Sequence, residues 1–173
     1  MSPTPTTQTD RRRRAARNGG VVRVGLISDT HGKLRPEALA ALQGCEAILH
    51  AGDIGRPEVL EGLRELTGHV IAVRGNVDGE WANGLLETAE VEIAGRRILV
   101  LHDLKQLDIE PRAAGIAVVV SGHSHQPRIE RRDGVLYVNP GSAGPRRFRL
   151  PVALARLEIS RTRLDAAIVE LSV

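Results

Sequence analysis

Short apolar runs that give way to polar residues recur along this chain. Residues 21–27, 47–50, 70–73, 98–101 and 116–120 are almost continuously apolar, and each is followed within a few positions by Asp, Asn or His. Apolar runs of this length, bounded by polar and glycine-containing segments, are typical of strands buried on both faces. The pattern therefore predicts five buried strands that carry polar side chains at their ends.

Two helices are predicted between the first three of these runs. Residues 36–42 and 57–66 repeat apolar side chains every three or four positions, as a helix with one buried face does. Each segment begins with a proline, which is favoured in the first turn of a helix. The alternation of strand and helix predicts parallel strands joined by right-handed crossovers.

The second half of the chain is predicted to be largely antiparallel. Strand-like segments occur at residues 88–93, 96–101, 128–132, 135–138, 152–159 and 164–171. Ala94-Gly95 and Asp133-Gly134 each separate two of these segments, and both are signals of a tight hairpin turn. Residues 103–115 predict one short helix that Pro111 interrupts. Together the elements predict an α/β fold in which two sheets pack face to face with helices outside them.

The composition is that of one domain with an aliphatic core. At 173 residues the chain is long enough for one substantial core and too short for two ordinary domains. It contains one Phe, one Trp and one Tyr, so Val, Leu, Ile and Ala must fill the core. The same scarcity argues against a surface that stacks the bases of single-stranded nucleic acid.

The positive charge of the chain is concentrated at its N-terminus. Residues 1–20 hold five arginines and one aspartate, whereas the rest of the chain has 19 basic and 20 acidic side chains. We expect residues 1–20 to form a disordered basic arm and residues 21–173 to form the single domain. Contact with nucleic acid is expected only weakly and only through this arm, because the body is close to neutral.

The sequence predicts a soluble cytoplasmic protein that does not enter a membrane. No segment approaches the roughly 20 apolar residues that cross a bilayer, and the N-terminus lacks the apolar stretch of a secretory signal. Cys45 is the only cysteine, which excludes an internal disulfide and suits a reducing compartment. It is predicted to be structural, because no motif of thiol catalysis surrounds it.

Candidate metal ligands follow the predicted strands. His123 and His125 lie two residues apart, and in an extended segment such a pair projects to one side. For this pair alone, two unrelated surface histidines are the alternative. The other strands are followed by five further candidates, Asp29, His31, Asp53, Asn76 and His102. Because strand ends in an open α/β sheet form a crevice at one edge, we expect these side chains to share a site.

The order of these residues resembles that of the calcineurin-like metallophosphoesterases. The motifs that carry the resemblance are Asp29-Thr30-His31, Gly52-Asp53, Gly75-Asn76-Val77-Asp78, His102 and Gly122-His123-Ser124-His125. The resemblance covers nearly everything from Val21 onward. Asn139-Pro140-Gly141-Ser142, followed by Pro145-Arg146, is similar to the YfcE-type phosphodiesterase branch. The resemblance implies a four-layer α/β/β/α sandwich of two mixed sheets with flanking helices.

The resemblance also implies a role for each candidate ligand. One metal would be held by Asp29, His31 and His125, the other by Asn76, His102 and His123, and Asp53 would bridge the two. This set of nitrogen and oxygen donors suits two divalent metal ions, with Mn²⁺ as the first expectation and Fe, Zn²⁺, Ni²⁺ or Co²⁺ as alternatives. A hydroxide between the metals would attack phosphorus in line with the leaving group. Asn76 is also a candidate contact for the phosphate.

Two positions depart from the pattern of the superfamily. Many relatives carry a histidine after the asparagine, thought to protonate the leaving oxygen, whereas Val77 stands here and cannot. We therefore expect a preference for acidic leaving groups such as aryl esters. The usual His-Gly-His is replaced by His102-Asp103-Leu104, which predicts a shorter cover and a more open cleft. Asp103 is expected to cap the following turn, with the orientation of an imidazole as the alternative.

The predicted function is a metal-dependent phosphoesterase, and more specifically a phosphodiesterase, acting on a small phosphate ester. The alternative is a non-catalytic metal-binding scaffold on the same fold, as in the retromer subunit that resembles this branch. A nuclease is disfavoured by the near-neutral body and the scarcity of aromatics. A homo-oligomer is compatible with the resemblance. His50 is expected to be buried beside the site, and Arg74 to contact a phosphate or a carboxylate.

Overall fold

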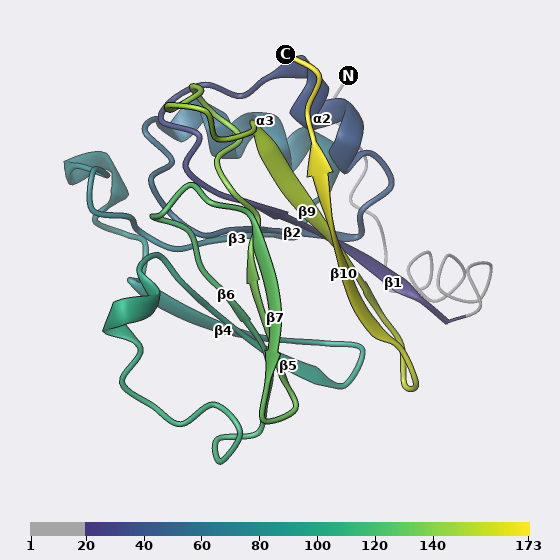
Figure 1. Cartoon of the computed structure of the whole chain (residues 1–173). Coiled ribbons are helices and arrows are strands. Elements are labelled where there is room, and N and C mark those ends of the chain that lie inside the picture. The colour runs from purple at the N-terminus through teal and green to yellow at the C-terminus, as the bar shows by residue number, and fades with distance from the viewer. Residues whose placement is uncertain (1–19) are drawn as a thin grey trace.

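Two five-stranded sheets pack face to face (Figure 1). The computed structural model describes residues 20–173, so the basic arm expected over residues 1–20 lies, apart from Gly20, outside the described residues. The first sheet has the strand order β10-β9-β1-β2-β3, and the second has the order β4-β5-β6-β8-β7. The α/β sandwich expected from the sequence is confirmed.

The first sheet combines three strands from the start of the chain with two from its end. Its strands are β1 (Val22–Ile27), β2 (Ala47–His50), β3 (Val70–Ala72), β9 (Ala153–Ile159) and β10 (Leu164–Glu170). β2 pairs in parallel with β1 and with β3, as the alternation of strand and helix predicts. β9 pairs antiparallel with both β1 and β10, so the C-terminal hairpin completes the sheet that the N-terminal strands begin.

The second sheet corrects one prediction. Its strands are β4 (Thr88–Ile93), β5 (Arg96–Leu101), β6 (Ile116–Val120), β7 (Arg128–Arg132) and β8 (Val135–Asn139). Both predicted hairpins are present, β4 with β5 and β7 with β8. However, β6 pairs in parallel with both β5 and β8, so a largely antiparallel second half is wrong for this strand. The parallel pairing brings the carboxyl ends of β5 and β6 to the same edge.

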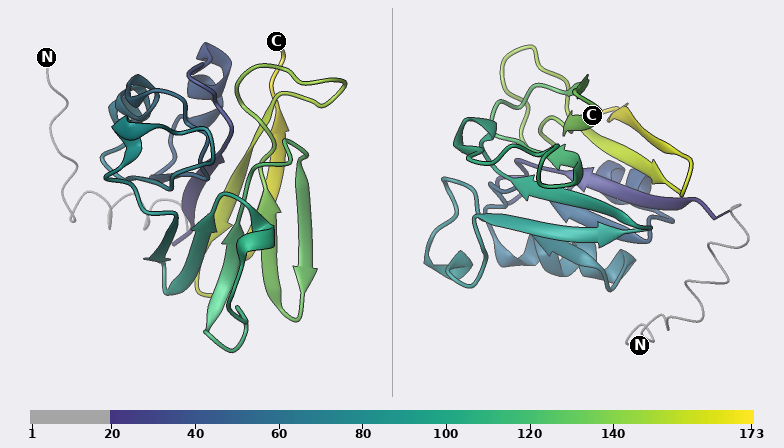
Figure 2. Two further views of the ribbon diagram at one scale, coloured as in Figure 1. Left: turned by 90° about the vertical axis from the view of Figure 1, so that its left-hand side faces the viewer. Right: turned by 90° about the horizontal axis from the view of Figure 1, so that it is seen from below.

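Two helices cover the outer face of the first sheet (Figure 2). They are α2 (Pro36–Leu42) and α3 (Pro57–Leu66), and each has proline in its first turn. On the outer face of the second sheet, the predicted short helix is a single 3-10 turn, η2 (Leu104–Gln106). A second such turn, η1 (Glu80–Ala82), precedes β4. The four-layer arrangement therefore has a thin fourth layer, and the sheet beneath it is only partly covered.

The core between the sheets is aliphatic, as the composition requires. Leu26 and Val120 are among the fully buried residues that the two sheets enclose, whereas Trp81 and Phe148 are exposed. Cys45 is buried in the cluster beneath the helices, where burial raises the pKa of its thiol, in agreement with a structural role. No helix within residues 20–173 combines the length and the apolar character needed to cross a bilayer.

Candidate metal centre

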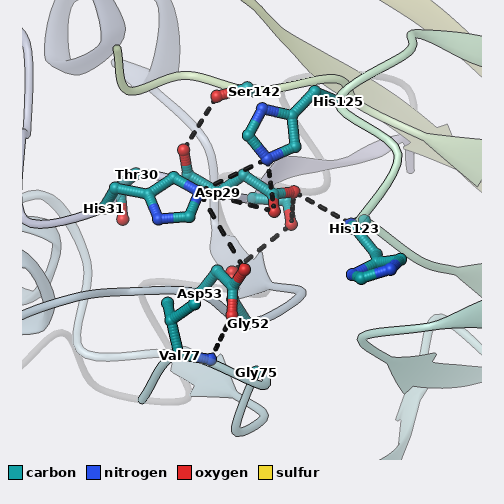
Figure 3. Close-up of polar contacts among 12 residues, drawn as sticks. Asp29, Thr30, His31, Gly52, Asp53, Gly75, Val77, His123, His125 and Ser142 are labelled. Carbon is teal, nitrogen blue, oxygen red and sulfur yellow. Dashed lines mark hydrogen bonds and ion pairs between the residues drawn. The ribbon is translucent and has the colours of Figure 1, made fainter. Parts of the chain in front are cut away.

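The carboxyl ends of five strands meet at one edge of the sandwich and bring all seven predicted ligands together. Asp29 and His31 follow β1, Asp53 follows β2, Asn76 follows β3, His102 follows β5, and His123 and His125 follow β6. In Figure 3, Asp29, His31, Asp53 and His125 point toward a common centre. Parallel strands that share an edge predict this convergence.

Three side chains form a first group of donors. The Nε2 atom of His125 lies 3.2 Å from Asp29 Oδ1 and 3.3 Å from His31 Nε2. The His31 Nε2 atom lies 3.9 Å from the same oxygen of Asp29. Both Asp29 and His125 are buried. Three ligand atoms within so short a span are suited to surround one cation.

A second group lies on the side of the site nearest to η2. The Nε2 atom of His102 lies 2.9 Å from Asn76 Oδ1, and the Nδ1 atom of His123 lies 3.2 Å from the same amide oxygen. The imidazole of His102 is buried, whereas the side chain of His123 is 47% exposed. The second group therefore opens to solvent, as the shortened cover predicts.

Asp53 lies between the two groups. Its Oδ2 atom is 3.2 Å from His102 Nε2 and 3.9 Å from His31 Nε2. Its Oδ1 atom accepts a hydrogen bond from the backbone N–H of Val77 at 3.0 Å, which fixes the carboxylate in this orientation. Asp53 thus approaches imidazoles of both groups, and a carboxylate oxygen of Asp29 also lies within 4.8 Å of a ring nitrogen of His102.

The hydrogen-bond pattern of the site fits a bound cation. His102 Nδ1 lies 2.7 Å from the carbonyl oxygen of Ala51, which can only accept, so Nδ1 carries the proton. In a neutral ring, the Nε2 lone pair then faces the oxygens of Asp53 and Asn76, which are acceptors as well. The buried Oδ1 of Asp29 has no hydrogen-bond partner within residues 20–173. A positive charge between these acceptors removes the repulsion of their lone pairs. In the metal-free chain a proton on His102 Nε2 supplies it, and a bound divalent cation would supply it in place of that proton.

The pKa values reflect the same crowding of acceptors. Burial is the largest influence on the pKa of His102 and lowers it, but the hydrogen bonds to Asp53 and Ala51 and the nearby carboxylates raise it overall. Burial would raise the pKa of Asp53, yet its hydrogen bonds from His102 and Val77 lower it. The pKa of His31 is lowered, chiefly by burial. Asp53 is therefore anionic and His31 neutral near pH 7, which are the forms that bind metals.

Five of the seven candidate ligands have a left-handed backbone conformation. The φ angles are 53° at Asp29, 46° at His31, 52° at Asp53, 68° at His123 and 59° at His125. Residues other than glycine rarely adopt this conformation, so the surrounding structure must hold it. Strain of this kind gathers at functional sites, and here it turns side chains at the strand ends toward one centre.

Two glycines allow the loops to approach one another. A Cβ atom at Gly75 would lie 2.2 Å from Asp53 Oδ1, and one at Gly122 would lie 2.6 Å from Asp29 Oδ2. Real Cβ atoms essentially never lie closer than 3.0 Å to such an atom, and both distances are shorter than this. These glycines of the predicted motifs are therefore required by the space that the two carboxylates occupy.

Asp78 has a supporting role that the sequence does not reveal. Its carboxylate accepts hydrogen bonds from the backbone N–H groups of Ile54 (3.2 Å), Gly55 (2.8 Å) and Gly75 (2.9 Å). These bonds fix the loop that carries Asp53 against the loop that carries Asn76. The only signal in the sequence is the position of Asp78 two residues after a candidate ligand.

Two serines hold Asp29, and they too are missed from the sequence. Ser28 Oγ donates to Asp29 Oδ2 at 2.7 Å. Ser142 Oγ donates to the Asp29 carbonyl oxygen at 2.8 Å (Figure 3). The backbone N–H of His123 donates to the same Oδ2 atom at 3.1 Å. Because Oδ2 is occupied by these two donors, Oδ1 is the oxygen left for a cation.

His50 is buried beside the site, as predicted. Thr30 Oγ1 donates to the carbonyl of Ile54 at 2.9 Å and therefore accepts from His50 Nε2, also at 2.9 Å. The backbone N–H of Gly52 donates to His50 Nδ1 at 3.2 Å. The bond from Gly52 requires a neutral ring, because Nδ1 must accept, and burial lowers the pKa of His50 to about 4. His50 thus holds Thr30, which lies between two candidate ligands in the sequence.

The two departures from the superfamily pattern lie at the open side of the site. Val77 is 51% exposed and has no group that could donate a proton from its side chain. Asp103 caps η2 as predicted, because its Oδ1 accepts from the backbone N–H of Lys105 at 3.0 Å. Its Oδ2 atom also lies 3.9 Å from His123 Nε2.

Arg74 corrects a prediction. Its guanidinium donates to the carbonyl oxygen of Asp78 and to Asn83 Oδ1, both at 3.1 Å. The salt bridge with a carboxylate is therefore wrong for residues 20–173, whereas the alternative, a contact with a phosphate, stays a prediction. The physical reason is that a backbone carbonyl and a side-chain amide oxygen of the segment after Asn76 accept the hydrogen bonds of the guanidinium.

A two-sheet sandwich whose strand ends gather carboxylate, imidazole and amide donors in this way defines the metallophosphoesterase class of proteins. The model of the calcineurin-like phosphoesterase superfamily domain matches residues 22–162. The chain belongs to this superfamily.

Similar proteins include two with functional names. A probable metallophosphoesterase of Methanothermobacter thermautotrophicus is 35% identical over 158 residues, which cover 84% of this chain and 91% of the relative. Phosphodiesterase YfcE of Escherichia coli K12 is 32% identical over 146 residues, which cover 70% of this chain and 79% of the relative.

Solved structures share the fold. A novel archaeal phosphodiesterase aligns with a TM-score of 0.71 at 24% identity. The alignment covers 86% of this chain and 100% of the chain of that structure. Wild-type Vps29 of Entamoeba histolytica, complexed with Zn²⁺, aligns with a TM-score of 0.68 at 24% identity and covers 86% of this chain and 99% of its own. At such identities these structures show the fold alone.

Proposed function

We propose that this chain is a metal-dependent phosphodiesterase whose seven candidate ligands hold two divalent cations. The position of Asp53 carries the proposal, because its Oδ2 atom lies 3.2 Å from His102 Nε2 and 3.9 Å from His31 Nε2. A carboxylate so placed can serve a cation in each group. Asp29, His31 and His125 would hold one ion, and Asn76, His102 and His123 would hold the other.

The donor set determines what chemistry the site would support. Its mixture of nitrogen and oxygen atoms favours divalent transition metals, with Mn²⁺ as the first expectation. When bound, a pair of such ions supplies a hydroxide nucleophile at neutral pH and neutralises charge on the phosphate. The remaining contribution of the chain is positioning, which is the larger part of catalysis in phosphoryl transfer.

Asn76 is the residue best placed to touch the substrate. It is exposed at the mouth of the site, with its Oδ1 directed toward His102 and His123. Its Nδ2 group has no hydrogen-bond partner within residues 20–173. That group would donate to a phosphate oxygen while Oδ1 faces the cation.

The leaving group is expected to be acidic. Val77 occupies the position at which a proton donor would assist departure of the leaving oxygen, and its side chain has no proton to donate. A general acid is typically worth about 10² to 10⁴ in rate, so poor leaving groups should react slowly. Aryl esters, whose leaving oxygens need no proton, are therefore the preferred substrate class.

The scaffold alternative shares the fold but is less well supported. The likeness to Vps29 concerns the fold alone and does not separate the two functions. Two observations favour catalysis: five of the seven donors lie at strained backbone positions, and a relative at 32% identity is named a phosphodiesterase. A scaffold has no evident need for the unfavourable backbone conformation at five ligand positions.

A metal add-back assay tests the proposal. Metal-stripped protein is assayed with bis(4-nitrophenyl) phosphate and 4-nitrophenyl phosphate, before and after addition of Mn²⁺, Ni²⁺ or Zn²⁺. We expect turnover only with added metal and faster turnover of the diester. Equal turnover by stripped protein contradicts the proposal, and metal binding without turnover of either ester supports the scaffold.

A further inference from the structure

A second cleft adjoins the candidate metal centre and has no role in the function proposed above. It lies on the outer face of the β7–β8 hairpin beside η2, and its volume is about 430 Å³. Its lining includes Leu104, Lys105, Arg128, Glu130, Arg132 and Tyr137. We call this space the side cleft. It exists because the thin fourth layer leaves the outer face of the second sheet partly uncovered.

The side cleft opens directly onto the candidate metal centre. Asp103 and His123 line one end of it. The same two residues also line a different cleft, of about 350 Å³, which extends over Asn76 and His102 at the metal centre. A substrate whose phosphorus lies at the metal centre therefore has room to extend one ester arm past His123 into the side cleft.

The charges along the side cleft are unequal. Glu130 is paired with Arg128 at 2.9 Å and with Arg132 at 3.0 Å. The ammonium group of Lys105, a lining residue that belongs to η2, has no ion-pair partner within residues 20–173. With Asp103 included, three cationic side chains face two anionic ones. An anion that entered the cleft would find uncompensated positive charge at Lys105.

The wall formed by β8 is suited to a planar group. Tyr137 is the only tyrosine of the chain, and the guanidinium of Arg132 lies over its ring at 4.9 Å from the centroid. The Tyr137 hydroxyl has no hydrogen-bond partner within the described part of the chain. Leu104 adds apolar surface beside the ring. Aromatic and guanidinium planes of this kind favour stacking of a further ring.

We propose that the side cleft binds one ester arm of the substrate, and that this arm is an aromatic ring bearing an anionic group such as a carboxylate or a phosphate. The inference rests on the proposed function and adds the substrate class. The ring lies along Tyr137 and the Arg132 guanidinium, and the anion faces Lys105. His123 marks the point at which the arm leaves the metal centre.

A substrate series with one common leaving group tests the inference. Methyl, phenyl and 4-carboxyphenyl esters of 4-nitrophenyl phosphate release the same nitrophenolate, so only the retained arm differs. We expect kcat/KM to rise along the series. Lys105→Met should lower the ratio of kcat/KM for the carboxyphenyl ester to that for the phenyl ester by about fivefold, the size of one exposed ion pair. Tyr137→Leu should lower the ratio of phenyl to methyl ester by about two- to tenfold.

Binding provides a readout that does not depend on turnover. Calorimetric titration of the metal-loaded protein with benzylphosphonate and 4-carboxybenzylphosphonate should show tighter binding of the carboxylate, and Lys105→Met should abolish the difference. Arg64→Met, which removes an exposed charge from α3, is the matched control and should leave the difference intact.

The failures of the two proposals are distinguishable. If none of the three esters is turned over with any metal, the proposed function fails. If all three are turned over with equal kcat/KM, or if Lys105→Met and Tyr137→Leu leave both ratios unchanged, the function stands and the side cleft does not bind the substrate arm.

Discussion

His102 and Asp53 face each other across the middle of the site, with Nε2 and Oδ2 3.2 Å apart. The carbonyl of Ala51 holds the other ring nitrogen of His102 at 2.7 Å, and the backbone N–H of Val77 holds the other oxygen of Asp53 at 3.0 Å. Each side chain is therefore held by a backbone contact on its far side, and the two atoms that face each other, Nε2 and Oδ2, are the ones left for a cation. Such a preorganised pair binds a cation without rearrangement.

Asp53→Asn tests whether this carboxylate is shared between two cations. The variant keeps the shape of the side chain and the oxygen that accepts from Val77, but it removes the charge. We expect the variant to fold, to lose turnover and to bind Mn²⁺ at least about 100-fold more weakly. Loss of a residue that only supports a ligand causes a smaller decrease in affinity. Calorimetric titration with Mn²⁺ measures the change. Asp165→Asn, an exposed carboxylate on β10, is the control, and unchanged metal affinity in Asp53→Asn contradicts the shared role.

Gly122→Ala tests the close packing behind Asp29. The added Cβ would lie 2.0 Å from Ser28 Oγ and 2.6 Å from Asp29 Oδ2, so the carboxylate must shift. We expect the free energy of unfolding to fall by about 1 to 3 kcal/mol, as for other overpacked sites, and metal affinity to fall with it. Urea unfolding and Mn²⁺ titration measure the two effects. A Cβ at Gly84 would meet nothing within 4 Å, so Gly84→Ala should change neither.

The elements of the fold were predictable where local chemistry decides them. Asp133 and Gly134 have φ angles of 50° and 78°, the consecutive left-handed pair that an Asp-Gly sequence favours in a hairpin. The proline at the start of α2 and α3 likewise marks each helix. The parallel pairing of β6 was not predictable, because it depends on how residues 103–115 cross the sheet, and that segment has no clear periodicity.

The candidate ligands were predictable because each follows a buried strand closely and is of a metal-binding type. The residues that hold these ligands in place were not predictable. Asp78, Ser28 and Ser142 act through hydrogen bonds to the backbone or to carboxylates, and most of their partners lie in other loops. The side cleft depends on how thinly η2 covers the second sheet, and side-chain types alone do not report this.

Val77→His tests the expectation about leaving groups. The residue is 51% exposed at the mouth of the site, so a histidine fits there without displacing the core. We expect the rate for an alkyl 4-nitrophenyl diester to change little, whereas cleavage of a dialkyl diester should rise by about 10² or more as the new imidazole donates a proton. Val77→Ala is the control for loss of the valine. An equal gain for both ester types would show that the histidine does not act as an acid.

His50 predicts how stability depends on pH. Burial lowers the pKa of this histidine from 6.5 to about 4. As the pH falls below 6.5, His50 therefore becomes protonated in the unfolded chain while it stays neutral in the folded chain. The free energy of unfolding should therefore fall between pH 6.5 and 4, by about 3 kcal/mol at most from this group. Urea unfolding in the presence of a chelator, at intervals from pH 7 to pH 4, measures the slope. His50→Gln loses stability at pH 7 because a buried hydrogen bond is weakened, but it does not titrate, so the difference between wild type and variant should shrink as the pH falls. A difference that stays constant across this range would mean that the imidazole is not held neutral by the contacts with Thr30 and Gly52.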